Sequence, residues 1–156
     1  MKIRILCVGR VKEAFYRNQL EDYTKAIRKR AEFEIIEVED EKTGEHMSDV
    51  EIRKVIQTEG DRMKKYLVRT PGRLIVALCI DGKRYSTEQW GKRLQQIIKE
   101  QEITEVTYVI GGSLGLAEEI GSLANQRLSF SALTYPHQLM RVILAQQIAD
   151  HMEDYL

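Results

Sequence analysis

Hydrophobic and polar residues follow two different periods along this chain. Short apolar runs rich in β-branched residues predict strands, and apolar residues at helical spacing predict helices between them. The predicted strands cover 2–8, 33–38, 73–80, 105–110 and, more weakly, 128–133. The predicted helices cover 12–29, 48–67, 86–98, a short stretch ending near 123, and 137–152. Strands and helices therefore alternate from one end of the chain to the other.

Local signals support this order. The spacing S-x-x-E at 48–51 and S-x-x-Q at 86–89 is that of a capping box, in which the N-cap and third helical residue bond each other. The strand 73–80 (RLIVALCI) is almost entirely apolar, as is typical of a strand covered on both faces. We therefore expect an α/β fold with a mostly parallel sheet and helices on both faces. Because no linker or repeat interrupts the order, residues 1–156 are expected to form a single domain.

Composition and charge exclude several classes of protein. Hydrophobic residues make up 43% of the chain, which argues against disorder, and no apolar run approaches the roughly 20 residues of a membrane helix. Basic and acidic residues balance at 24 each, so an RNA partner would have to bind a local basic patch. Cys7 and Cys79 lie in apolar runs, and the first residues do not resemble a signal peptide. We expect buried thiols and a cytoplasmic location.

One long stretch of the chain is almost uncharged. Between Val106 and Met140 the only charged residues are Glu118, Glu119 and Arg127. Such a stretch is typical of an interior, an interface or a ligand pocket. Together with the apolar last helix, it predicts a buried interface.

The sequence GGSLG at 111–115 lies between a predicted strand and a predicted helix. Glycines at such a place let a ligand approach the backbone, and the helix N-terminus presents free N–H groups. The spacing is neither the GxGxxG of a dinucleotide site nor that of a phosphate-binding P-loop. A tight turn between strand and helix explains the glycines equally well, so both interpretations stay open.

The segment LSFSALTYPH at 128–137 is uncharged and rich in small and hydroxyl-bearing residues. Its backbone groups could read the edge of an adenine, although a polar-faced edge strand is the favoured interpretation on pattern alone. His137 falls in the first turn of the last helix, where the helix dipole favours a neutral imidazole that can act as a base. Arg141 follows on the same face and is paired with a carboxylate or faces an anionic ligand. No residues stand at metal-ligand spacing, so no metal site is expected.

Four segments together resemble one known family. They are MKIRILCVGRVKE, IDGKRYSTEQW, YVIGGSLGL and LSFSALTYPHQLMRVILAQQI. On these segments the chain is similar to the bacterial RlmH family of the SPOUT class, which methylates N3 of a pseudouridine in 23S ribosomal RNA. The resemblance runs from Met1 to about Ile148 without an obvious gap. The combination of IGG-x-x-GL with LS-x-S-x-x-T-x-PH-x-x-x-R is specific to that family.

The resemblance implies a fold whose C-terminal part threads through a loop to form a trefoil knot, an exception to the rule that connections do not thread loops. It also implies a homodimer, S-adenosylmethionine as methyl donor, and 23S rRNA of the assembled ribosome as acceptor. Leu78 matches a cofactor contact, and Gly111 matches the first glycine of IGG. The residues that match the loop around the adenosine are Phe130, Ser131, Ala132, Leu133, Thr134 and Tyr135. His137 and Arg141 match the helix start and are the expected catalytic residues.

Methylation at N3 requires that an imide proton leave. This predicts His137 as the base and Arg141 as the group that stabilises a negative oxygen or a phosphate. Positioning alone could instead supply most of the rate.

Members of the family continue through a Tyr-Arg pair into a Pro-Tyr-His-basic tail. Here Ala149 and Asp150 stand in place of the pair and the sequence ends at Leu156. On the resemblance we therefore expect cofactor binding to be kept and RNA binding to be weaker. Two alternatives stay open: a non-catalytic ribosome- or RNA-binding member that keeps the cofactor pocket, and a nucleotide- or flavin-binding α/β protein unrelated to methylation.

Overall fold

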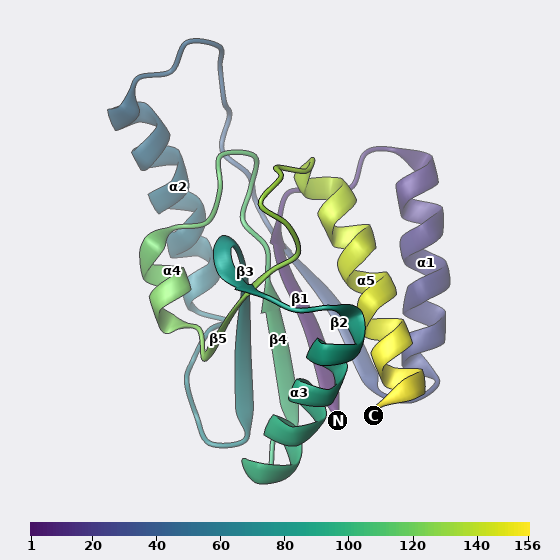
Figure 1. The fold of residues 1–156 in the computed structure, drawn as a ribbon. Coiled ribbons are helices and arrows are strands. Elements are labelled where there is room, and N and C mark those ends of the chain that lie inside the picture. Colours follow the sequence, from purple (N-terminus) through teal and green to yellow (C-terminus); the bar gives the residue numbers. More distant parts are fainter.

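Strands and helices alternate along the whole chain in a computed structural model that describes residues 1–156 (Figure 1). The strands are β1 (Lys2–Val8), β2 (Glu32–Val38), β3 (Arg73–Arg84), β4 (Glu105–Val109) and β5 (Gln126–Ser129). The helices are α1 (Ala14–Arg28), α2 (Asp49–Lys64), α3 (Thr87–Glu100), α4 (Glu118–Leu123) and α5 (His137–Asp154). The predicted β-α alternation is confirmed.

The strands form one five-stranded sheet in the order β2-β1-β4-β3-β5, and every neighbouring pair is parallel. All carboxyl ends therefore lie at the same edge of the sheet. The connection after β1 leads to β2 at one edge of the sheet, whereas the connection after β4 leads to β5 at the other edge. In open α/β sheets, such a change of direction is where ligands bind, beyond the carboxyl ends of the strands.

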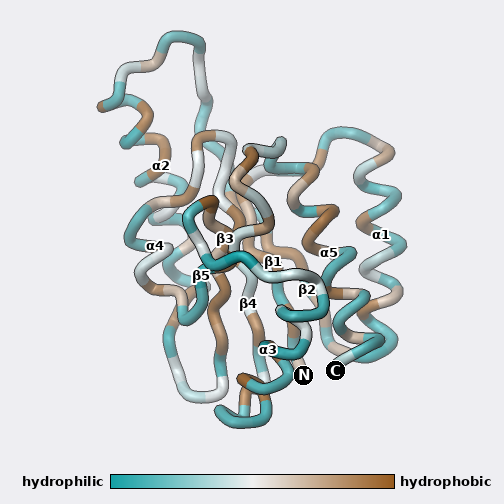
Figure 2. Tube along the Cα trace, viewed as in Figure 1, coloured by the Kyte–Doolittle hydropathy of each residue, from teal (hydrophilic) through white to brown (hydrophobic).

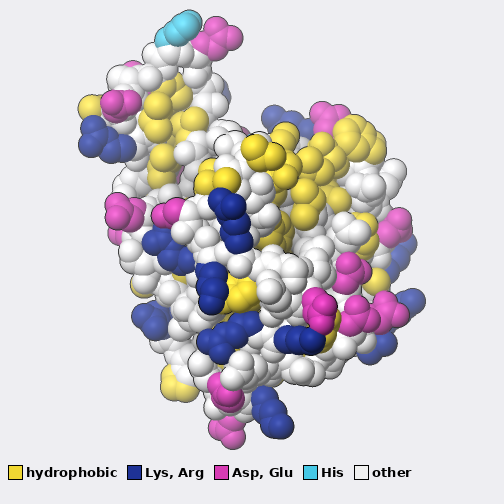
Figure 3. Space-filling view, in the orientation of Figure 1, with side chains coloured by type: hydrophobic (Ala, Val, Ile, Leu, Met, Phe, Trp, Pro, Cys, Tyr) yellow, Lys and Arg dark blue, Asp and Glu magenta, His cyan; other side chains and the backbone are white.

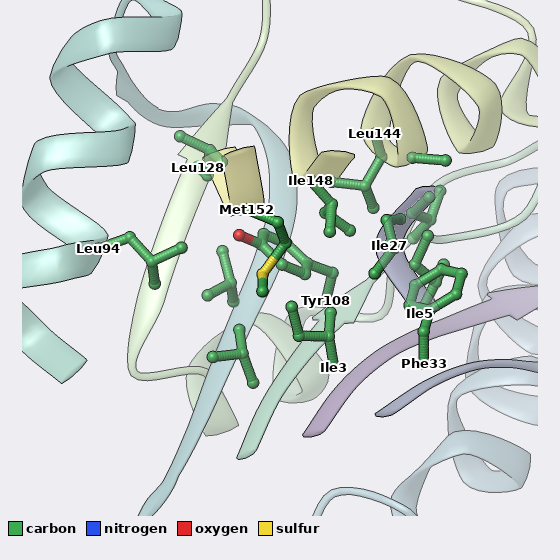
Figure 4. Packing of buried hydrophobic residues seen from close by; sticks show 14 of the residues in the cluster. Ile3, Ile5, Ile27, Phe33, Leu94, Tyr108, Leu128, Leu144, Ile148 and Met152 are labelled. Carbon is green, nitrogen blue, oxygen red and sulfur yellow. The ribbon is translucent and has the colours of Figure 1, made fainter. Parts of the chain in front are cut away.

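Helices cover both faces of the sheet, as predicted. Alternate side chains of β1 show the division: Ile3 and Ile5 belong to a core under α1, α3 and α5, whereas Leu6 and Val8 belong to a smaller core under α2 and α4. Figure 4 shows Ile148 and Met152 of α5 packed over residues from the strands, among them Tyr108. Figure 2 shows hydrophobic strands at the centre, with polar positions on the outer sides of the helices.

Both predicted capping boxes are present. The Ser48 hydroxyl accepts from the Glu51 N–H at 3.2 Å, and the Ser86 hydroxyl accepts from the Gln89 N–H at 3.1 Å, with the reciprocal side-chain bonds also formed. These bonds satisfy N–H groups that a helix start leaves free. α2 ends at Lys64, three residues before the predicted end at 67.

Two strands differ from the prediction. β3 continues beyond 80 to Arg84, because its last residues pair with β5 again after an irregularity between Leu78 and Lys83. β5 covers Gln126–Ser129 rather than 128–133. It ends there because the Ser129 hydroxyl donates to the Ser131 carbonyl at 3.1 Å, and the Leu133 N–H donates to the Ser131 hydroxyl at 2.9 Å. Such local bonds compete with a strand ladder.

The last helix, α5, carries apolar residues all around its axis. Its buried residues include Val142, Leu144, Ala145 and Ile148. None of the helices combines the length and apolarity that crossing a bilayer requires. The trefoil knot that the resemblance implies stays a prediction.

Candidate functional site

A cavity of about 820 Å³ opens at the carboxyl edge of the sheet. Its walls are the end of β3, the glycine loop between β4 and α4, and the segment between β5 and α5. The volume lies within the range typical of small-molecule sites. The cavity lies beyond the carboxyl ends of β3, β4 and β5, beside the point between β1 and β4 where the strand order changes direction.

The glycine loop closes on itself. Gly115 donates its N–H to the Gly112 carbonyl at 3.1 Å and adopts a φ of +108°, a conformation that favours glycine. A Cβ on Gly111 would lie 2.6 Å from the backbone of Gly115 and Leu116. Gly111 lines the cavity, but the loop's own backbone, and not only a ligand, requires a glycine there. The structure therefore shows the tight turn between strand and helix, whereas the approach of a ligand to this loop stays a prediction.

Glu59 of α2 lies behind the glycine loop, on the side away from the cavity. The side chain is 5% exposed, its Oε2 accepts from the Glu41 N–H at 3.0 Å, and its Oε1 is buried without a hydrogen-bond partner. A Cβ on Gly112 would lie 2.6 Å from that Oε1. Burial raises the pKa of Glu59, and the nearby Asp40 adds to the effect, whereas the Glu41 N–H and Arg62 oppose it. The sequence pattern did not identify Glu59, because a single acidic residue in a helix carries no signal of burial.

The segment 130–135 supplies the opposite wall. None of its backbone N–H or C=O groups bonds to another backbone group, so most of them remain free for a ligand. Its residues that line the cavity are Phe130, Ser131, Leu133, Thr134 and Tyr135, whereas Ala132 is exposed and does not line it. Leu133 is 69% exposed, which is unusual for a large apolar side chain.

The end of β3 forms one wall of the cavity. One residue of this wall was a candidate site residue from the sequence, and the others were not. Leu78, which the resemblance predicts as a cofactor contact, lines the cavity together with Cys79 and Asp81. Arg127 donates to both carboxylate oxygens of Asp81, at 2.9 and 3.1 Å, and also lines the cavity. Cys79 is half-buried rather than buried, and burial raises the pKa of its thiol. The polar sequence DGKR, which directly follows the apolar strand residues, could have indicated that polar side chains lie at the carboxyl end of this strand.

His137 is the first residue of α5 and lines the cavity half-buried. Burial lowers its pKa below the ordinary value of 6.5, and Arg141 lowers it further, against a raising effect of Asp40. The imidazole is therefore neutral at physiological pH and able to accept a proton.

Arg141 does not line the cavity. Its side chain is buried, and its guanidinium bonds to a Glu37 carboxylate oxygen at 2.7 Å and to the carbonyls of Val8 and Gly9 at 3.1 and 3.0 Å. Of the two possibilities left open by the sequence, pairing with a carboxylate is the one observed. Arg141 thus fixes the start of α5 against the ends of β1 and β2, one helical turn after His137.

The site offers a cavity with apolar and backbone surface, the charged side chains Asp81, Glu118 and Arg127 on its walls, one neutral imidazole and no assembled metal ligands. No group of three His, Cys, Asp or Glu side chains is placed to hold a metal ion. What the arrangement can do is bind a flat, largely uncharged group through backbone contacts and hold a proton acceptor beside it.

Comparisons with known proteins agree on one family. A family profile described as "Predicted SPOUT methyltransferase" matches residues 1–150. The chain is 44% identical over 148 residues to the ribosomal RNA large subunit methyltransferase H of Bifidobacterium animalis subsp. lactis, and 40% identical over 148 residues to the protein of the same name in Streptococcus equi subsp. zooepidemicus. Each alignment covers 95% of this chain and 91% of the relative.

Solved structures show the same fold at low sequence identity. A structure described as a probable methyltransferase from Bordetella pertussis Tohama I has a TM-score of 0.54 at 13% identity, covering 96% of this chain and 95% of that one. A candidate methyltransferase from Legionella pneumophila, solved with the bound cofactor SAM, has a TM-score of 0.53 at 10% identity, covering 96% of this chain and 66% of that one.

Proposed function

The chain belongs to the SPOUT methyltransferase family, and we propose that it transfers a methyl group from S-adenosylmethionine to the RNA of the large ribosomal subunit. The observation that carries this proposal is the cavity at the carboxyl ends of β3, β4 and β5 in a chain so similar, over almost its full length, to ribosomal RNA large subunit methyltransferases. The finer proposal is that the acceptor is N3 of a pseudouridine in 23S rRNA of the assembled ribosome.

The residues of the cavity fit S-adenosylmethionine. The segment 130–135 has backbone groups free to bond an adenine, and Leu78 and Phe130 offer apolar surface for its ring. The glycine loop allows close approach of a ligand to its backbone. When bound, S-adenosylmethionine supplies an electrophilic methyl group, and the chain's own part is to hold donor and acceptor in line.

We propose His137 as the group that takes the N3 proton of the acceptor. It lines the cavity, and burial keeps it neutral at physiological pH. Imide N–H groups are weak acids, so a positioned base accelerates transfer from N3. Arg141, which was expected to contact the substrate, is proposed instead as a positioning residue for His137, because its guanidinium is used within the fold.

A transfer assay tests the function. Purified protein, labelled S-adenosylmethionine and 70S ribosomes should yield label in 23S rRNA, and nucleoside digestion with mass spectrometry should give 3-methylpseudouridine. Ribosomes that carry uridine at the acceptor position serve as the control and should take up no label. Absence of label from both kinds of ribosome, with a folded protein that binds S-adenosylhomocysteine, would refute the enzymatic proposal.

We further propose a homodimer in the cytoplasm. The support is that the apolar residues of α5 are not confined to one face of the helix, together with the nearly uncharged stretch from Val106 to Met140. Sedimentation at micromolar concentration should give about twice the chain mass of 18.1 kDa. No observation favours the non-catalytic alternative, since the cavity retains its walls, and family membership does not support a flavin- or nucleotide-binding protein unrelated to methylation.

A further inference from the structure

A second cavity, of about 210 Å³, adjoins the first one. The two share four wall residues, which are Leu128, Phe130, Tyr135 and Met140. The remaining walls come from the start of α3 and from α5, and these residues are Tyr85, Ser86, Thr87, Trp90, Ile143 and Gln147. We call this space the aromatic cavity, because four of its ten residues are aromatic.

The aromatic wall is fixed in place. Trp90 is 4% exposed, and its indole N–H donates to the Tyr108 hydroxyl at 3.3 Å inside the core. The Tyr85 ring lies against it with centroids 5.5 Å apart. A wall held this way can stack against a flat ring without first losing conformational freedom.

Polar groups at the aromatic cavity match the edge of a nucleobase. Thr87 donates its hydroxyl to Gln147 Oε1 at 2.7 Å, which fixes the amide and leaves its NH₂ group without a partner in the chain. An amide NH₂ can donate to the carbonyl oxygens that pyrimidine bases carry. The cavity therefore combines stacking surface with a free donor.

Two cations directly precede Tyr85 in the chain, and we call them the rim of the aromatic cavity. Lys83 and Arg84 are exposed and form no ion pair, and the Lys83 ammonium lies 5.0 Å from the centre of the Tyr85 ring. Figure 3 shows a hydrophobic patch over the start of α5 with Lys and Arg side chains gathered below it, over the end of β3 and around α3. In a chain with zero net charge, this is a local basic patch of the kind that RNA binding requires.

We propose that the aromatic cavity receives an unstacked base of the RNA substrate, one that flanks the nucleotide to be methylated, while Lys83 and Arg84 bind the adjoining phosphates. This inference rests on the proposed function. The shared wall of Phe130, Tyr135 and Met140 places the flanking base next to the cavity in which the acceptor meets the methyl donor. Stacking on aromatic side chains beside cationic contacts is the general way in which proteins hold single-stranded RNA.

Substitutions of Tyr85 test the stacking contact. Tyr85→Leu keeps apolar bulk but removes the ring, and Tyr85→Phe keeps the ring. We expect Tyr85→Leu to raise KM for 70S ribosomes by about 5- to 150-fold, the range found for loss of one base–aromatic stack. Tyr85→Phe should leave KM near that of the wild type, and both variants should bind S-adenosylhomocysteine with unchanged affinity in calorimetry.

Substitutions of the rim test the phosphate contacts. Lys83→Ala and Arg84→Ala should each lower the slope of ribosome affinity against salt by about one unit. Lys29→Ala is the matched control, because Lys29 is also exposed and unpaired but follows α1, at the amino edge of the sheet. It should leave the slope unchanged.

A direct readout comes from Trp90, the single tryptophan of the chain. In the presence of saturating S-adenosylhomocysteine, a short single-stranded oligoribonucleotide containing pseudouridine should quench its fluorescence, and Tyr85→Leu should weaken that binding. This measurement needs no methyl transfer, so it separates failure of the aromatic cavity from failure of the proposed enzyme activity. If the wild type transfers no methyl group to RNA, the proposed function fails, whereas the fluorescence result still decides whether the cavity binds RNA.

Three outcomes would overturn the inference. One is a folded Tyr85→Leu variant with unchanged ribosome KM and unchanged oligonucleotide affinity. Another is a loss confined to S-adenosylhomocysteine affinity, which would assign the cavity to the cofactor. The third is a change of sedimentation mass in Tyr85→Leu, which would assign this face to contact between two copies of the chain.

Discussion

Glu59 Oε1 faces Gly112 so closely that a Cβ on the glycine would lie 2.6 Å from that oxygen. The contact joins the buried side of α2 to a loop whose other side lines the candidate cofactor cavity. Glu59 also bonds the backbone of Glu41, so one carboxyl connects the chain after β2 with the chain after β4. The glycine loop therefore packs against a side chain that does not line the cavity.

This contact predicts non-additive effects of substitution. Gly112→Ala should weaken binding of S-adenosylhomocysteine, because the added methyl group would displace the loop from Glu59. In a Glu59→Ala background the same change should cost less, with a coupling of about 0.5–3 kcal/mol as is usual for residues in contact. Calorimetry on the four proteins of the cycle measures it. Gly44→Ala, in an exposed loop with open space around it, is the control, and equal costs in both backgrounds would contradict the prediction.

Gly111→Val should disable the cavity through the loop backbone. The nearest atoms to its added Cβ would be those of Gly115 and Leu116, at 2.6 Å. Overpacking of this kind costs about 1–3 kcal/mol. If this cost is borne by the ligand-bound conformation of the loop, the affinity for S-adenosylhomocysteine falls by about 5- to 150-fold. Calorimetry with S-adenosylhomocysteine measures the loss, and circular dichroism confirms that the sheet is intact. Wild-type affinity in a folded variant would show that the loop is not part of the cofactor site.

The rate of methyl transfer should depend on pH through His137. Because burial lowers its pKa below 6.5, kcat/KM should rise with pH up to that lowered value and stay level at neutral pH. His137→Gln should reduce kcat/KM by about 100-fold or more and remove the acidic limb of the profile. His46→Asn is the control, since His46 lies in an exposed loop with a φ of 56° that asparagine tolerates. An acidic limb that persists in His137→Gln would assign the base elsewhere.

Two arginine–carboxylate pairs predict different effects on stability. Arg141 is buried while its partner Glu37 is exposed, and its guanidinium also bonds the buried carbonyls of Val8 and Gly9. Arg141→Ala should therefore lower the free energy of unfolding by about 2–5 kcal/mol, because each buried acceptor left without a donor costs about 1–3 kcal/mol. The Arg127–Asp81 pair is exposed, so Arg127→Ala should cost less than about 1 kcal/mol. Urea unfolding of both variants measures the difference. Similar losses would mean that Arg141 is not the structural anchor inferred here.

Much of the fold followed from local pattern. The bounds of β1 and both capping boxes agree with the prediction because hydrophobic periodicity and N-cap bonds are properties of neighbouring residues. The parallel sheet followed from the alternation of strands and helices. That order also placed Leu78, Gly111 and Phe130 near one another, since the carboxyl ends of parallel strands share one edge.

Only the tertiary structure decided which of these residues face the cavity and which support it. The sequence did not decide whether Arg141 is paired or free. In the structure it is paired with Glu37, which lies 104 positions away in the sequence. The burial of Glu59, the return of β3 to β5 and the adjacency of Tyr85 to Phe130 have the same origin. Each depends on contacts between segments far apart in the chain, and such contacts leave no periodic signal in the residues that make them. The sequence thus determined the elements and the edge at which the site forms, whereas packing determined the role of each side chain there.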